Sequence, residues 1–242
     1  MILARIDANK AQIDHHRPMQ EPLLSQLRNY YRVGLTWSSN ALEGSSLTES
    51  ETKVLLEDGL TVGGKPIRDY YEATGHARAY DAMFSLLDAS SALTEHDICE
   101  LHRLFYSQVD EVKAGAYRTE RVFISGSQYP LPRPEQVPGM MAEFVRWMAD
   151  NEAGLHPVVF AAQAHKRFVF IHPFIDGNGR VSRLLMNLCL LRRGYTLAII
   201  PPILRAEYIA MLEKAHTDDA PFVAFIAERA LETQKDVLRL LG

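Results

Sequence analysis

Residues 165–194 have the sequence HKRFVFIHPFIDGNGRVSRLLMNLCLLRRG, in which two apolar helical patterns flank a glycine-containing turn. Its first part is an apolar helix that we expect to end at His172, because Pro173 disfavours the α conformation in the residue before it. A compact loop follows as far as Gly179. Apolar residues then recur at helical spacing until Gly194 ends a second helix. The sequence therefore predicts a helix, a tight loop and a second helix.

This loop combines groups that suit a magnesium-bound polyphosphate. A glycine-containing loop that enters a helix directs several backbone N–H groups at one place, where the helix dipole adds positive potential. Arg180 and Arg183 lie three residues apart, so both guanidinium groups can reach the same side, and their fixed donors suit phosphate oxygens. Asp176 offers the hard oxygen that Mg²⁺ prefers, and a neutral His172 can accept a proton near pH 7. Taken singly, each feature is commonly a plain turn or a solvated surface, but together their roles are compatible.

Residues 172–183 resemble the signature of the Fic family, H-P-F-x-D/E-G-N-G-R-x-x-R, and match it at every specified position. The resemblance extends from roughly residue 94 to residue 241. It implies a mostly α fold, with a Fic-type helical bundle core. It also implies an enzyme, a protein adenylyltransferase that moves AMP from ATP onto a Ser, Thr or Tyr hydroxyl of a target protein, the chain itself included. Mg²⁺ is the implied cofactor, and ATP is the co-substrate.

The resemblance implies a role for each matched residue. His172 would be the catalytic base, and Asp176 would hold Mg²⁺ between the phosphates of ATP. The remaining ATP-binding positions would be a phosphate cradle of Gly177, Asn178 and Gly179, with Arg180 at the β-phosphate and Arg183 at the γ-phosphate. Asn187, one turn further on, would face the nucleoside, although helix packing explains it equally well.

A second feature lies before the catalytic stretch. Residues 121–132, RVFISGSQYPLP, alternate apolar and polar residues around a Gly-Ser turn, which is typical of a β-hairpin. The hairpin resembles the flap of the Fic family, which registers a target segment by strand addition. Ile124 and Gly126 are the expected flap contacts, and an ordinary hairpin is the alternative.

A third feature lies near the N-terminus. Residues 35–44, LTWSSNALEG, predict a short helix ended by glycine. Glu43 then sits at the helix C-terminus, where the dipole disfavours a carboxylate by about 0.3–1 kcal/mol. A cation elsewhere in the fold would compensate, and Arg183 is the candidate.

The same residues carry a second resemblance. Residues 39–44 resemble the inhibitory motif of the Fic family, S/T-x-x-x-E-G/N, with Ser39 and Glu43 at its defined positions. Their place before the core matches the subclass that inhibits itself from an N-terminal helix. The resemblance implies that Glu43 pairs with Arg183 and removes the γ-phosphate anchor. A surface carboxylate that merely ends a helix is the alternative.

Helical periodicity dominates the rest of the chain. Further helices are expected over residues 3–15, 21–33 and 67–87, from capping boxes at 48–51 and 94–97, and from residue 134 to the C-terminus. We expect an N-terminal helical region, residues 1–90, which includes the inhibitory helix. A Fic catalytic core, residues 91–242, follows it.

Composition sets the remaining limits. The 242 residues are 47% hydrophobic and 23% charged, which is typical of a globular protein rather than a disordered one. A net charge of −4 argues against broad nucleic-acid binding. The N-terminus lacks the order of a signal peptide and no apolar run is long enough to span a membrane, so we expect a cytoplasmic protein without membrane contact. Cys99 and Cys189 are expected to be free thiols.

Several alternatives stay open at this stage. The same site could remove AMP from a modified protein, or the chain could be a nucleotide-sensing regulatory module without transferase activity. The sequence gives neither the target nor the residue type modified. A homodimer is one possible assembly, in which residues 1–33 would either mediate dimerisation or brace the inhibitory helix.

Overall fold

The structure is a computed structural model and describes residues 2–88 and 90–242. Its α-helices, in chain order, are α1 (Ile2–Asp14), α2 (Leu23–Ala41), α3 (Glu49–Asp58), α4 (Ile67–Met83), α5 (Glu95–Tyr106), α6 (Val137–Asn151), α7 (Pro157–Ile171), α8 (Asn178–Arg192), α9 (Arg205–Lys214) and α10 (Ala220–Leu241). Three short 3-10 helices are η1 (Phe84–Leu86), η2 (Pro134–Gln136) and η3 (Pro202–Leu204). The predicted mostly α fold is confirmed.

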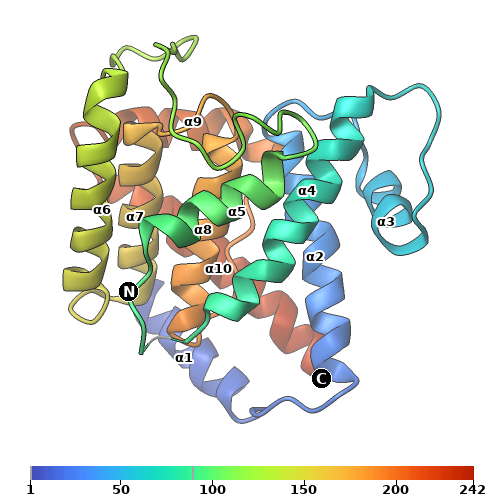
Figure 1. Cartoon of the computed structure of the whole chain (residues 1–242). Coiled ribbons are helices and arrows are strands. Elements are labelled where there is room, and N and C mark those ends of the chain that lie inside the picture. Colours follow the sequence, from blue (N-terminus) through green and yellow to red (C-terminus); the bar gives the residue numbers. More distant parts are fainter. Residues whose placement is uncertain (1, 89) are drawn as a thin grey trace.

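Helix α8 forms the centre of this arrangement (Figure 1). Its side chains are buried almost all the way round, including Leu184, Leu185 and Leu188, as expected for a helix that is apolar on every face. It packs closely against α7 and also contacts α2, α4 and α5. Helix α6 lies beyond α7, and α3 stands off at the opposite side of the molecule (Figure 1). The loop between α7 and α8 is therefore held by the best-packed pair of helices.

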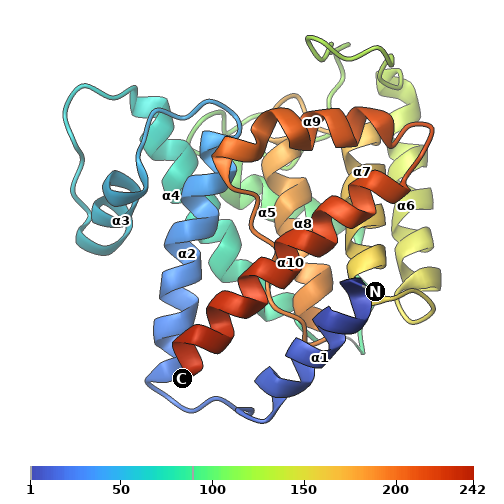
Figure 2. The same cartoon turned by 180° about the vertical axis from the view of Figure 1, so that it is seen from behind.

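The back of the molecule is covered by the two ends of the chain (Figure 2). Helix α10 crosses behind α7, and α1 packs along α10. One continuous hydrophobic core includes Ile6 of α1, Leu35 of α2 and Leu188 of α8. Residues that are far apart in the sequence thus contribute to the same core.

The two predicted capping boxes are present. Thr48 accepts a hydrogen bond from the backbone N–H of Glu51, and the Glu51 carboxylate accepts one from the N–H of Thr48. Helix α3 ends at Gly59, which takes the left-handed conformation. Thr94 and Asp97 form the same arrangement at the start of α5.

One helix replaces the two that the sequence predicts over residues 21–33 and 35–44. Helix α2 runs without a break through Gly34 to Ala41. Glycine costs a helix interior about 1 kcal/mol relative to alanine, but burial of Val33 and Leu35 on either side of it outweighs that cost. Helix α2 nevertheless ends before Gly44, so Glu43 lies at a helix C-terminus as predicted.

The predicted β-hairpin is wrong. No strand occurs in residues 2–88 or 90–242, and residues 119–133 form an irregular loop with a turn at Gly126. We call this segment the 119–133 loop. The second predicted strand contains Pro130 and Pro132, which have no backbone N–H to donate to a ladder. The alternation of apolar and polar residues could not compensate for these missing donors.

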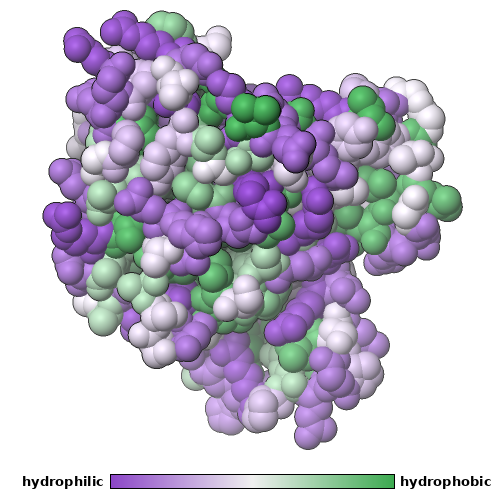
Figure 3. All heavy atoms as spheres, in the orientation of Figure 1, coloured by the Kyte–Doolittle hydropathy of each residue, from purple (hydrophilic) through white to green (hydrophobic). Residues whose placement is uncertain are grey.

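The surface facing the viewer in Figure 3 is mainly hydrophilic, with apolar side chains scattered among polar ones. In the 119–133 loop, Phe123 is 89% exposed and Ile124 is 40% exposed. Cys99 and Cys189 are free thiols, as predicted. Within the described ranges, no helix combines the length and the apolar character needed to cross a membrane.

Candidate active site

The candidate base, His172, directly follows α7. Its backbone is left-handed (φ 51°, ψ 58°), and no other non-glycine residue in the described part of the chain has a positive φ. Its N–H still donates to the carbonyl oxygen of Phe168, at 3.0 Å. Burial lowers the pKa of His172 to about 4, so the imidazole is neutral at pH 7 and can accept a proton.

The loop after His172 is closed by its own side chains. Asn178 accepts from the N–H of Phe174 and donates to its carbonyl oxygen, both at 2.9 Å. The Phe174 ring stacks on His102 of α5, with centroids 3.7 Å apart. Gly177 has a φ of 79°, and a side chain there would collide with the Phe105 ring. The side chain of Asn178 therefore shapes the loop, and the backbone N–H groups at the start of α8 face outward from it.

Arg180 lies in a network of carboxylates that sequence reasoning missed. Its guanidinium is 2.6 Å from Glu72 of α4 and 3.0 Å from Asp176. Arg68, one turn before Glu72, bonds to both carboxylates. Both Arg180 and Glu72 are buried, so each compensates the charge of the other.

Arg183 is 2% exposed and bonds to the end of α2. Its Nη2 donates to the Glu43 carboxylate at 2.7 Å and to the carbonyl oxygen of Ser39 at 2.8 Å. Its Nε donates to the Ser39 hydroxyl at 2.9 Å, and Tyr208 of α9 lies 3.4 Å from Nη1. The contact that the sequence predicts between Glu43 and Arg183 is therefore present.

The Glu43 carboxylate lies directly over Gly179 at the start of α8, where a side chain on Gly179 would collide with it. Burial acts to raise the pKa of Glu43, but the charges of Arg183 and Arg180 outweigh burial and hold the pKa below its ordinary value. Glu43 is thus ionised at neutral pH. It therefore places a negative charge beside the first turn of α8, near the positive end of the helix dipole.

A cavity of about 170 Å³ opens beside these residues. Glu43, His172 and Gly179 line it together with Ile124 of the 119–133 loop and Tyr208 of α9. Its walls are otherwise mainly apolar. The base, the start of α8 and the predicted flap residue Ile124 therefore meet at one cavity.

Asp176 is the candidate magnesium ligand. Its side chain is 38% exposed, and Oδ1 accepts from the N–H of Gly177 at 2.6 Å. Burial acts to raise the pKa of Asp176, but Arg180, that N–H and Arg68 together keep it below its ordinary value. No group of three or more His, Cys, Asp or Glu residues gathers as a metal site among the residues that the structure describes. One ionised, accessible carboxylate fits Mg²⁺, which usually takes one or two protein carboxylates together with phosphate oxygens and water.

Asn187 does not lie at the cavity. It is fully buried, its amide donates to the carbonyl oxygen of Arg183 at 2.9 Å, and its Oδ1 accepts from the N–H of Ala198 at 2.7 Å. Its polar atoms join α8 to the segment that follows it. The structure therefore favours the packing explanation over a nucleoside contact.

Comparison with known proteins agrees with this geometry. The family model described as "Fic/DOC family" matches residues 92–190. A solved structure of Fic-1 (aa134–508) from C. elegans is 30% identical, covers 99% of this chain and 71% of that chain, and gives a TM-score of 0.88. The chain belongs to the Fic/DOC family.

Other Fic proteins extend the likeness. A Fic domain containing signaling protein from Bacteroides thetaiotaomicron is 27% identical with a TM-score of 0.88, over 99% of this chain and 97% of that one. "Protein adenylyltransferase Fic" from Drosophila persimilis is 40% identical over 194 residues, which are 79% of this chain and 38% of that protein. Its counterpart from Drosophila willistoni is 36% identical over 228 residues, 93% of this chain and 45% of that protein. The chain thus spans less than half the length of these Drosophila relatives.

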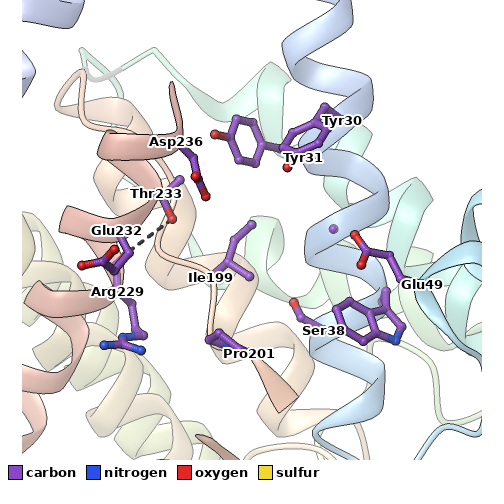
Figure 4. A pocket seen from close by; sticks show the side chains of 12 residues that line it. Tyr30, Tyr31, Ser38, Glu49, Ile199, Pro201, Arg229, Glu232, Thr233 and Asp236 are labelled. Carbon is purple, nitrogen blue, oxygen red and sulfur yellow. Dashed lines mark hydrogen bonds between the residues drawn. The ribbon is translucent and has the colours of Figure 1, made fainter. Parts of the chain in front are cut away.

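A second cavity of this Fic protein, about 230 Å³, lies between α2 and α10 (Figure 4). Tyr31 and Ser38 of α2 line it, with Ile199 and Pro201 opposite. Thr233, on the α10 wall, donates to a backbone carbonyl one turn earlier, at Arg229. None of the residues that the sequence predicts for the ATP site lines this cavity.

Proposed function

We propose that this chain is a protein adenylyltransferase that transfers AMP from ATP to a Ser, Thr or Tyr hydroxyl of a target protein. The observation that carries the proposal is that a neutral His172 and the N-terminus of α8, at Gly179, line one cavity. The ionised Asp176 lies in the loop between them. The relatives named as protein adenylyltransferases add support.

In the proposed reaction, His172 accepts the proton of the target hydroxyl. The hydroxyl oxygen forms a bond to the α-phosphorus of ATP, and the bond between that phosphorus and the bridging oxygen of pyrophosphate breaks. The N–H groups at the start of α8, around Gly177 to Gly179, stabilise the charge that develops on the α-phosphate. The products are an AMP ester of the target and pyrophosphate.

Asp176 would hold Mg²⁺ beside the polyphosphate, where the ion supplies charge neutralisation. Arg180 is the proposed partner of the β-phosphate and Arg183 that of the γ-phosphate. Both guanidinium groups are buried and already bonded to carboxylates. ATP therefore has to compete with Glu72 and Asp176 for Arg180, and with Glu43 for Arg183.

This competition is the basis for a proposed autoinhibition. While Glu43 is bonded to Arg183, the γ-phosphate lacks its cation and meets a carboxylate directly over Gly179. The negative charges of the γ-phosphate and the Glu43 carboxylate would repel each other at such close contact. ATP could then bind only in an orientation that turns its α-phosphate away from the attacking hydroxyl.

The 119–133 loop is the proposed docking surface for the target. Ile124 lines the cavity beside His172, and the turn at Gly126 is exposed. Glu213 of α9 holds the loop in place by accepting from Ser127 and from the N–H of Gln128. An exposed backbone next to a reactive site can pair with an extended target segment, even though the loop itself contains no strand.

Removal of AMP from a modified target is a second candidate. Glu43 and His172 line the same cavity, so the carboxylate could orient a water molecule for attack on a phosphodiester. A nucleotide-sensing module without transferase activity is a third reading. Neither needs a change in the residues assigned above.

The experiment compares two labels. In the Glu43→Gly variant, ATP labelled at the α-phosphate should transfer its label to protein in the presence of Mg²⁺, whereas ATP labelled at the γ-phosphate should not. Transfer of the γ-label would make the chain a phosphotransferase and contradict the proposal. Release of AMP from a previously modified target, without new labelling, would favour the reverse reaction.

A further inference from the structure

The side chain of Arg118 connects the candidate base to the 119–133 loop. It is 3% exposed, and its Nε donates to the carbonyl oxygen of His172 at 2.7 Å. Its Nη2 donates to the carbonyl oxygen of Pro132 at 2.7 Å, and its Nη1 to that of Glu120 at 3.2 Å. One guanidinium therefore bonds to the backbone of the base and to both ends of the loop.

The backbone of Arg118 takes part as well. Its N–H donates to the carbonyl oxygen of Pro173 at 2.9 Å. The carbonyl oxygens of two consecutive residues, His172 and Pro173, thus accept hydrogen bonds from one residue. A rigid planar guanidinium suits this task, because its donors point in fixed directions.

The conformation of His172 explains why such an attachment is needed. A left-handed backbone is unfavourable for a residue with a side chain, and a following proline favours an extended conformation instead. Without the bonds from Arg118, the peptide of His172 would relax toward the extended region. The imidazole would then turn away from the cavity that it lines with Gly179.

We propose that Arg118 is a positioning residue for AMP transfer, which holds His172 in its left-handed conformation and fixes the 119–133 loop over the same cavity. The inference rests on the proposed function, since the orientation of His172 affects a rate only if this residue is the base. Arg118 lies behind the base and acts through it, so it is not expected to contact the nucleotide.

The charge of Arg118 acts on the pKa of His172, which can be measured. A residue with a purely structural role would not change this pKa through its charge. Arg118 before the loop, Glu43 at the end of α2 and Asp176 in the catalytic loop act on the imidazole through their charges. Glu213 of α9 and His216, which follows α9, line the same cavity as His172. Burial is the main cause of the low pKa of His172, and the positive charge of Arg118 acts in the same direction. Removing this charge is therefore expected to raise the pKa of His172.

The test uses Arg118→Met and Arg118→Lys in a Glu43→Gly background. Both should lower the rate of AMP transfer at saturating ATP by about 100-fold, the usual cost of a misplaced catalytic group. The dissociation constant for ATP should stay within about twofold, since Arg118 is not part of the proposed ATP site. Only Arg118→Met should move the acidic limb of the rate profile to higher pH, because lysine keeps the charge. Arg146→Met, on the exposed face of α6, is the matched control.

A full transfer rate in either variant would overturn the inference, as would a parallel loss of ATP binding. NMR titration of the His172 imidazole in the same proteins gives a test that does not depend on activity. An imidazole pKa in Arg118→Met equal to that of the parent would also contradict the inference. Absence of transfer in the Glu43→Gly parent itself would instead count against the proposed function, and the NMR comparison would still decide the role of Arg118.

Discussion

The carboxylate of Glu43 lies 2.7 Å from Nη2 of Arg183, although 140 residues separate them in the sequence. Ser39 contributes two further acceptors to the same guanidinium, so the end of α2 saturates most of its donors. In the proposed mechanism this guanidinium serves either α2 or the γ-phosphate of ATP. The balance between these two partners should therefore set the rate of AMP transfer.

The Ser39 hydroxyl should contribute to this balance. Ser39→Ala removes one hydrogen bond that holds Arg183 toward α2, and a net hydrogen bond of about 1 kcal/mol corresponds to roughly a fivefold change in an equilibrium. We expect a severalfold faster transfer of α-labelled AMP, measured as an initial rate. Ser38→Ala is the matched control, because the Ser38 hydroxyl donates to the carbonyl oxygen of Leu35 and not to Arg183. Equal rates in the two variants would argue against the role of Ser39.

His172 should be needed for transfer but not for nucleotide binding. In a Glu43→Gly background, His172→Ala should lower the transfer rate by about 10²- to 10⁴-fold, the range expected for loss of a general base. Calorimetry should find ATP affinity unchanged within about twofold. His96→Ala, at an exposed position in the first turn of α5, should leave both quantities unchanged. Retained transfer in His172→Ala would remove this residue from the base role.

The pH dependence of transfer should reflect the burial of His172. Burial lowers the pKa of His172 to about 4. The base must be neutral, so activity should be present above this pKa and lost as the pH falls through it. In a Glu43→Gly background, kcat/KM should stay level from pH 8 to about pH 5 and decline only below that, since it reports groups of the free enzyme. A decline centred near pH 6.5, with the fold intact by circular dichroism, would contradict this prediction.

Glu72 should contribute to stability. Glu72→Ala would leave the buried Arg180 without its main counter-ion, and breaking a buried pair in this way typically costs about 3–5 kcal/mol. Asp176 and Arg68 remain nearby, so we expect a value toward the lower end of this range. Urea unfolding monitored by circular dichroism would measure the change. Glu143→Ala, at an exposed position on α6, should leave the unfolding midpoint nearly unchanged.

The sequence was most informative where local rules decide the structure. The proline after His172 marks the end of α7, and the Thr48 capping box marks the start of α3. Glu43 lies at a helix end, where a carboxylate is disfavoured. This position indicates that a cation from a distant part of the sequence lies close to it in the fold. That cation is Arg183.

Residues that meet only through tertiary packing could not be predicted in the same way. Arg68 bonds to Asp176 across 108 residues, and Arg118 reaches the carbonyl oxygen of His172 across 54. Neither residue stands in a local pattern that points to the loop. The hairpin prediction failed for a different reason: the side chains of this segment alternate as in a strand, but Pro130 and Pro132 have no backbone N–H to donate to a partner strand.

Intact-mass analysis of wild type and Glu43→Gly, each incubated with Mg²⁺ and ATP, measures both the transferase activity and its inhibition by Glu43. Glu57→Gly serves as the control, since Glu57 lies near the C-terminus of α3 but is exposed. We expect Glu43→Gly to gain mass by whole AMP units about 10- to 100-fold faster than wild type or the control, in line with a coupling of 1–3 kcal/mol. No AMP adduct on Glu43→Gly or on an added protein substrate, together with no ATP binding by calorimetry, would contradict both the transferase activity and its inhibition by Glu43.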